Sequence, residues 1–214
     1  MVVADGLTRD LVDGKYPIPS PAAIAAEAFG TTFFESIKRQ SINNNSPSEE
    51  ALYQAFSQGN THIQAINQQH NPRPDYLAND YWACVAAAAV VHQRQVYWAS
   101  IGDCGIAVIN ELGALTFRTA NDKAEADRYI DFSGRSWNDP AWRKVRRQEH
   151  RNNPDLVVNG HHASYGALTG EEKSLAFVNT GRMALHPGDA VIVYSDGMEA
   201  IVHSLRFRTH LAKE

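Results

Sequence analysis

The sequence predicts an α+β fold in which helices are layered on antiparallel sheets. Three observations support this prediction. Helical and strand-like patterns are segregated along the 214 residues rather than alternating. The strand-like segments between residues 81 and 118 have short separators, which is typical of antiparallel hairpins. Apolar runs near both ends of the chain stop at Asp-Gly, where a buried strand would leave a sheet.

The N-terminal third predicts one strand followed by two helices. The strand covers Val2–Gly6, and residues 7–19 form a loop containing prolines. Ser20-Pro21 predicts the start of a helix whose apolar positions continue to Ile37. A capping box at residues 46–49, with Pro47 in the first turn, predicts a second helix that ends near His70.

The rest of the chain predicts mainly strands, interrupted by one polar segment. The strands of the middle region are 81–91, 95–101, 105–110 and 114–118. Residues 119–165 are polar and weakly periodic, so we interpret them as a partly helical flap or insertion. Further strands are predicted at Leu175–Val178 and Met183–Leu185, and another leads into Asp196. A terminal helix is predicted from Met198 to about Ala212. We expect a single domain over residues 1–214.

Composition argues against several classes of partner. The chain is 43% hydrophobic and 21% charged, with a net charge of −4, which does not favour a nucleic acid or an acidic membrane. The basic run Arg143–Arg147 is interpreted as a solvated helix face. The longest apolar run, Ala83–Val91, is too short to cross a bilayer. The N-terminus has no signal-peptide pattern, so we expect a cytoplasmic protein. We also expect Cys84 and Cys104 to be reduced, buried thiols.

The two Asp-Gly sites carry the main prediction about function. Asp5 and Asp196 each follow an apolar strand and come from opposite ends of the sequence. Two carboxylates that converge in this way suit a hard divalent cation such as Mg²⁺ or Mn²⁺. The structural alternative is that both acids only cap turns.

Four motifs in order resemble the metal-dependent serine/threonine phosphatases of the PP2C family, including its bacterial members. They are Val2–Gly6, Tyr97–Cys104, Tyr165–Gly170, and Leu185–Asp189 running into Tyr194–Met198. The resemblance covers nearly the whole chain. It implies an αββα sandwich of two antiparallel β-sheets flanked by helices.

The resemblance also implies a site and a reaction. Asp5 would bridge two Mn²⁺ or Mg²⁺ ions, Gly6 would offer its carbonyl oxygen, and Asp196 would bind one of the ions. Asp103 would help to hold a third ion, or would only stabilise its turn. Asp5 and Asp196 would be the catalytic residues. The implied reaction is hydrolysis of phosphoserine or phosphothreonine on a protein substrate by a metal-activated water, without a covalent intermediate.

Some positions depart from the family pattern. Thr8-Arg9 and Cys104-Gly105 stand where the family has other residues, and Arg9 is a candidate phosphate ligand. Further family elements would precede Met1 and follow Glu214, so the chain is either a fragment or a trimmed variant with fewer metal ligands. These departures leave open a weak or inactive pseudophosphatase that acts as a protein-binding module. A third hypothesis is a metal-dependent hydrolase of non-phosphate substrates.

Two other features receive a structural interpretation. His161-His162 has no third ligand nearby in the sequence, so we expect exposed histidines rather than a metal site. Ser195 lies beside Asp196 but has no nucleophile-elbow sequence around it. The sequence predicts no oligomeric state.

Overall fold

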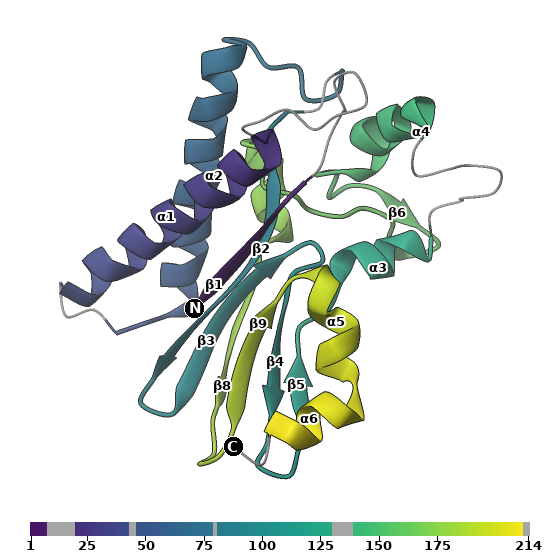
Figure 1. The fold of residues 1–214 in the computed structure, drawn as a ribbon. Coiled ribbons are helices and arrows are strands. Elements are labelled where there is room, and N and C mark those ends of the chain that lie inside the picture. The colour runs from purple at the N-terminus through teal and green to yellow at the C-terminus, as the bar shows by residue number, and fades with distance from the viewer. Residues whose placement is uncertain (8–19, 43–45, 79–80, 130–138, 212–214) are drawn as a thin grey trace.

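Two antiparallel sheets stack against each other in the computed structural model, which describes residues 1–7, 20–42, 46–78, 81–129 and 139–211 (Figure 1). The four-stranded sheet has the order β1-β2-β3-β8. Its strands are β1 (Val2–Gly6), β2 (Cys84–His92), β3 (Gln95–Ile101) and β8 (Asn179–Ala184). The three-stranded sheet has the order β5-β4-β9. Its strands are β5 (Leu115–Arg118), β4 (Gly105–Ile109) and β9 (Ala190–Tyr194).

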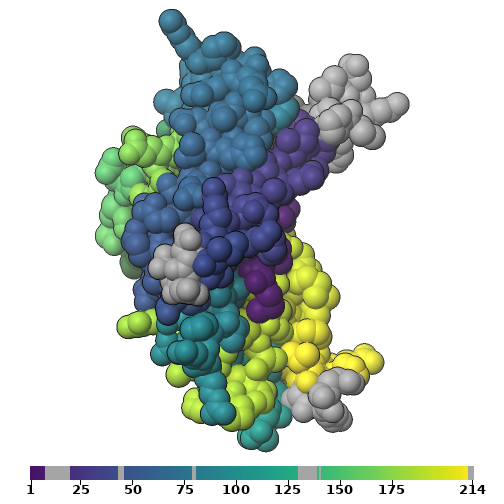
Figure 2. Space-filling view, turned by 90° about the vertical axis from the view of Figure 1, so that its left-hand side faces the viewer, coloured from purple at the N-terminus to yellow at the C-terminus, as the bar shows by residue number. Residues whose placement is uncertain are grey.

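Helices cover the outer face of each sheet, which confirms the predicted αββα sandwich. The helices α1 (Pro21–Ile42) and α2 (Glu49–His70) lie on the four-stranded sheet (Figure 1). The helices α5 (Asp196–His203) and α6 (Leu205–Leu211) lie on the three-stranded sheet. Figure 2 shows β1, in purple, between the α1–α2 layer and the yellow C-terminal segments.

The alternation of side chains along β2 explains why this strand is apolar throughout. Cys84, Ala86 and Ala88 belong to the core between the sheet and α1–α2, together with three aromatic rings of those helices. The intervening Val85, Ala87 and Ala89 belong to the core between the two sheets. A strand buried on both faces has no polar side, so its sequence is a continuous apolar run.

A third core lies between the three-stranded sheet and the C-terminal helices. It contains Ala107 of β4, Tyr194 of β9 and Val202 of α5, with Phe207 of α6 packed against them. Three apolar interfaces therefore separate four layers, as the sandwich requires.

The predicted flap contains short elements. These are α3 (Asp122–Asp127), α4 (Pro140–Val145), the π-helix η1 (Arg146–His150), β6 (Val157–Val158) and β7 (His161–His162). Lys144 is exposed and Arg143, Arg146 and Arg147 are partly exposed, so the basic run Arg143–Arg147 is only in part a solvated face. The guanidinium of Arg146 lies 4.9 Å from the ring centre of Tyr165, a cation–π contact that withdraws it from solvent.

Several element boundaries differ from the prediction, and β8 begins at Asn179, four residues before the predicted Met183. The α2 helix is capped by Ser48, whose hydroxyl accepts a 3.0 Å hydrogen bond from the Ala51 amide, and not by Ser46. The predicted strand Leu175–Val178 lies mostly within the 3₁₀ helix η2 (Glu172–Phe177). The predicted terminal helix is two helices, because Ser204 has extended backbone angles that interrupt the hydrogen-bond ladder.

Cys84 and Cys104 are both free and buried, as predicted. Burial raises the pKa of both thiols, and nearby carboxylates raise it further. None of the described helices combines the length and the apolar character needed to cross a membrane.

Candidate active site

Strand pairing brings the predicted acidic residues to the same end of the two sheets. Asp5 pairs with Val85 on β2, and the next β2 residue, Ala86, pairs with Ile101 at the end of β3. The Gly102-Asp103 turn follows at once and leads into β4. Because Gly105 of β4 pairs with Tyr194 of β9, Asp103 and Asp196 lie at the same end of the three-stranded sheet.

The carboxylates of Asp196 and Asp103 are close enough to Asp5 to raise its pKa. Burial is the largest cause that raises the pKa of Asp5. The negative charges of Asp196 and Asp103 raise this pKa further, as does a hydrogen bond between the Asp5 and Asp196 side chains, while Lys123 opposes them. A site that holds several carboxylates against their mutual repulsion favours a bound cation.

A lysine that the sequence analysis did not identify lies within this acidic cluster. The Lys123 Nζ atom donates a 2.6 Å hydrogen bond to Asp103 Oδ2 and forms an ion pair with it. The Asp103 side chain is only 9% exposed, so the pair is largely shielded from water. Burial alone would lower the pKa of Lys123, but the hydrogen bond and charge of Asp103 outweigh burial and raise it.

Close packing explains why glycine follows Asp5. A Cβ atom at Gly6 would lie 2.3 Å from the carbonyl oxygen of Ala22, so β1 and the first turn of α1 require the absence of a side chain there. Gly197, in contrast, has no atom within 4 Å of the corresponding position. Helix packing therefore requires glycine at position 6, whereas Gly197 leaves open space beside Asp196.

Packing also accounts for one departure from the family pattern. A Cβ atom at Gly105 would lie 2.6 Å from the ring of Tyr194, which covers this position. Tyr194 belongs to the core beneath α5, so a longer side chain at position 105 would displace that core. Gly102 adopts a positive φ of 77°, which permits the tight turn before Asp103.

The other candidates are placed apart from the acidic cluster or outside the described residues. Arg9 lies outside them, as does Thr8. His161 and His162 are exposed, as expected. Among the described residues, no group of three or more His, Cys, Asp or Glu side chains is arranged to hold a metal ion.

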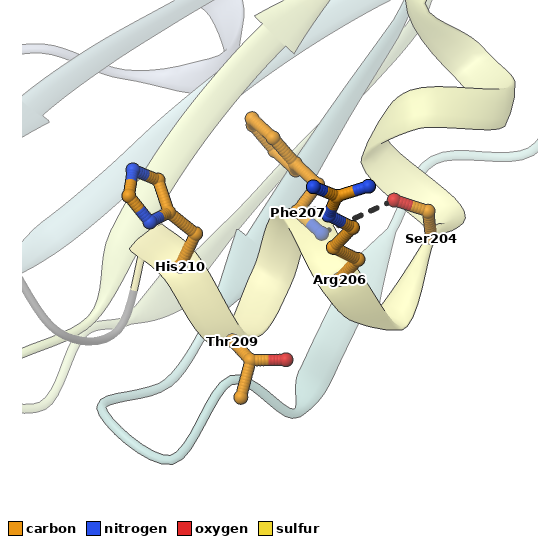
Figure 3. Close-up of a pocket in the computed structure, with 5 residues that line it drawn as sticks. All are labelled: Ser204, Arg206, Phe207, Thr209 and His210. Atoms are coloured by element: carbon orange, nitrogen blue, oxygen red, sulfur yellow. Dashed lines mark hydrogen bonds between the residues drawn. The ribbon is translucent and has the colours of Figure 1, made fainter.

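A cavity of about 700 Å³ lies at α6 and is lined by Ser204, Arg206, Phe207, Thr209 and His210 (Figure 3). The Ser204 hydroxyl accepts a 3.2 Å hydrogen bond from the Phe207 amide, which caps the start of α6. In Figure 1, α6 lies toward the opposite end of the three-stranded sheet from the start of α5, where Asp196 is placed. We therefore assign no part of the candidate site to it.

Comparison with known proteins decides the family. A family model described as protein phosphatase 2C matches residues 1–213. The chain belongs to the protein phosphatase 2C family. No curated protein matches the sequence.

Solved structures of this family are similar to the chain in fold. The Mycobacterium tuberculosis serine/threonine phosphatase PstP/Ppp has a TM-score of 0.59 and 16% identity, over 99% of this chain and 80% of that one. The catalytic domain of PstP in complex with two manganese ions has a TM-score of 0.54 and 16% identity, over 99% and 92% of the two chains. PppA, a regulatory component of the T6SS in Pseudomonas aeruginosa, has a TM-score of 0.56 and 15% identity, over 98% and 71%. At these identities the likeness concerns the PP2C fold.

Proposed function

We propose that this PP2C-family protein hydrolyses phosphoserine and phosphothreonine monoesters on proteins, using Mn²⁺ or Mg²⁺. The observation that carries the proposal is the convergence of Asp5, Asp103 and Asp196 through strand register. Family membership supports phosphatase chemistry, and the manganese in the PstP structure supports the choice of metal.

The residues fit a hard divalent cation. Carboxylate and carbonyl oxygens are the ligands that Mg²⁺ and Mn²⁺ prefer. Burial and the charges of Asp196 and Asp103 raise the pKa of Asp5, and a bound cation would offset both effects. These two carboxylates, with the carbonyl of Gly6, would hold the first two ions. Asp103 would bind a third ion only after its ion pair with Lys123 is broken.

The residues of the chain divide the remaining tasks. When bound, the metal supplies positive charge for the phosphate and acidity for water. Asp5, on the strand β1, and Asp196, the first residue of α5, would hold the metal ions at this end of the sheets. Lys123 holds the Asp103 carboxylate in an ion pair. Its positive charge compensates the negative charge that this carboxylate would otherwise present to the substrate phosphate.

The experiment is hydrolysis of p-nitrophenyl phosphate with Mn²⁺, comparing the unmodified protein with Asp196→Ala. Loss of this carboxylate removes a metal ligand, so we expect the rate to fall by roughly 100-fold or more, since even an outer-shell partner costs up to that much. The control is Asp155→Ala, at an exposed flap position. Equal rates for the Asp196→Ala variant and the unmodified protein would refute the assignment.

A second candidate function is a pseudophosphatase that binds a protein partner. The observation that favours it is the Lys123–Asp103 ion pair, which occupies one of the three carboxylates. Calorimetric titration with Mn²⁺ separates the two candidates. Binding of two ions supports the enzyme, whereas no binding together with no hydrolysis supports the scaffold.

A further inference from the structure

A pocket of about 410 Å³ lies beside α3 on the flap. Its walls come from α3, β7, η2 and the first residue of β8. Asp122 lines it and directly precedes Lys123, the ion-pair partner of Asp103. Asn179 lines it too and pairs in register with Ser100, just before the Gly102-Asp103 turn. Two residues that line the pocket are therefore neighbours, in sequence or in strand register, of residues at the acidic cluster.

One wall of the pocket is acidic. Asp122 and Glu125 are three residues apart on α3, so they share one face of the helix. The Asp122 carboxylate accepts a 2.6 Å hydrogen bond from the side-chain amide of Asn179, which is a neutral partner. Burial raises the pKa of Asp122 to about 6, and the negative charge of Glu125 adds to this effect while the hydrogen bond from Asn179 opposes it. Glu125 is exposed and pairs with the exposed Arg128 at 3.0 Å.

The remaining walls combine aromatic and apolar side chains with the side chains of His161 and His162 and the hydroxyl of Ser164. The Tyr129 ring stacks on His161 with centroids 4.4 Å apart and planes 8° from parallel. Phe177 contributes an apolar surface. Ser164 lines the pocket and is only 2% exposed, and its hydroxyl has no hydrogen-bond partner in the described part of the chain. A hydrogen-bonding ligand that filled the pocket would satisfy this hydroxyl.

We infer that this pocket binds an arginine side chain of the phosphoprotein substrate, close to the phosphorylated residue. The inference rests on the proposed function and names its substrate class. A guanidinium is planar, donates several hydrogen bonds in a fixed fork, and stacks on aromatic rings. It would meet the carboxylates of Asp122 and Glu125, the Tyr129–His161 stack, and the hydroxyl of Ser164.

Other ligand classes fit the pocket less well. An anionic group would face two carboxylates, which costs energy at short range. A purely apolar side chain would bury Asp122 further without a compensating partner. A lysine would satisfy the charge but would neither stack as a plane nor bind both carboxylates bidentately.

The test uses the Mn²⁺-loaded protein and phosphoserine peptides in which one arginine is moved residue by residue along the sequence. Each peptide is matched by one with citrulline, which keeps the shape of arginine but not its charge. At the best position we expect KM for the arginine peptide to be roughly fivefold lower than for the citrulline peptide, the upper range for a partly exposed ion pair. The kcat values should be similar, because the pocket binds and does not react.

A double-mutant cycle locates the effect. In Glu125→Gln, which leaves the Asp122 carboxylate in place, the ratio of the two KM values should fall clearly below fivefold, whereas in Glu27→Gln, at an exposed position on α1, it should remain roughly fivefold. Equal KM values for the two peptides in the unmodified protein, or equal loss of discrimination in both variants, would overturn the inference.

Failure of the inference can be told apart from failure of the proposed function. If the protein hydrolyses p-nitrophenyl phosphate but has equal KM values for the arginine and citrulline peptides, only the inference about the pocket is overturned. If nothing is hydrolysed, fluorescence anisotropy of the labelled peptides decides the pocket by itself. Tighter binding of the arginine peptide than of the citrulline peptide then supports it, and equal binding overturns it.

Discussion

Lys123 changes the charge of the candidate site more than any other single residue. Its ammonium group lies 2.6 Å from Asp103 and lowers the pKa of Asp5 against the effect of the other acids. The cluster of three carboxylates therefore carries one built-in positive charge. A metal ion that used Asp103 would have to compete with this ion pair.

Replacing Lys123 by methionine should tighten metal binding. The substitution keeps most of the side-chain length but leaves Asp103 available to a divalent cation. We expect the Kd for Mn²⁺, measured by calorimetry, to fall by roughly tenfold, which is about 1.4 kcal/mol for a pair that is partly screened by water. The matched control is Lys173→Met at an exposed position of η2. Weaker binding in the Lys123→Met variant would mean that Lys123 orients a ligand rather than competing with the metal.

Residues with a local signature could be predicted from the sequence, and residues without one could not. Asp5 and Asp196 end apolar runs before glycine, and Asp103 follows a glycine in a tight turn, so each position is marked by its neighbours. Lys123 has no such mark, because its partner is twenty residues away and the contact depends on how α3 docks. Ser164 has no local signature either, because its burial depends on how the flap folds.

At the scale of elements, hydrogen bonds of single side chains decide where helices begin. Ser46 and Ser48 are both of a residue type that commonly caps helices. Pro47, between them, suits the first turn of a helix that starts at Ser46. The structure selects Ser48, whose hydroxyl accepts from Ala51. Sequence patterns specify that a helix starts here, but the choice between two caps depends on how α2 meets the sheet.

The two serines give a matched pair for measuring this cap. Ser48→Ala should lower the free energy of unfolding by about 1 kcal/mol, the usual contribution of an N-cap hydroxyl. Ser46→Ala should have little effect, because this exposed residue lies outside the helix. Urea unfolding of both variants checks the prediction. An equal loss in both would mean that the helix starts differently in solution.

Buried amides hold the predicted Tyr165–Gly170 motif against the rest of the molecule. The Asn67 side chain donates to the carbonyl oxygens of Trp82 and Thr169, and Asn60 accepts from the amide of Gly170. Leu168 exchanges backbone hydrogen bonds with Cys84 at the start of β2. The motif therefore ties α2, β2 and the flap together close to Asp5.

At the scale of the whole molecule, layer order could be predicted from the sequence while the surface of the flap could not. Segregated helices and strands, together with apolar runs buried on both faces, are enough to indicate stacked sheets between helices. The strand predicted at Leu175–Val178 is wrong, because a short apolar run fits a 3₁₀ turn equally well until its neighbours are known. The pocket between α3 and β7 arises only from long-range docking, so no local pattern indicates it.

The buried carboxylate of Asp122 should make the stability of the whole molecule depend on pH. Its pKa is about 6 in the folded state against an ordinary 3.8, so the folded protein holds this proton more tightly than the unfolded chain. Stability from this group is therefore lost as the pH rises from about 4 to 6, and the full cost is present above that range. Asp122→Asn removes the charge, so it should stabilise the protein at pH 7.5 by on the order of 2 kcal/mol and have no such effect at pH 4. Urea unfolding at both pH values, with Asp155→Asn as the exposed control, measures this difference, and a variant that is less stable than the unmodified protein at pH 7.5 would contradict the desolvation of Asp122.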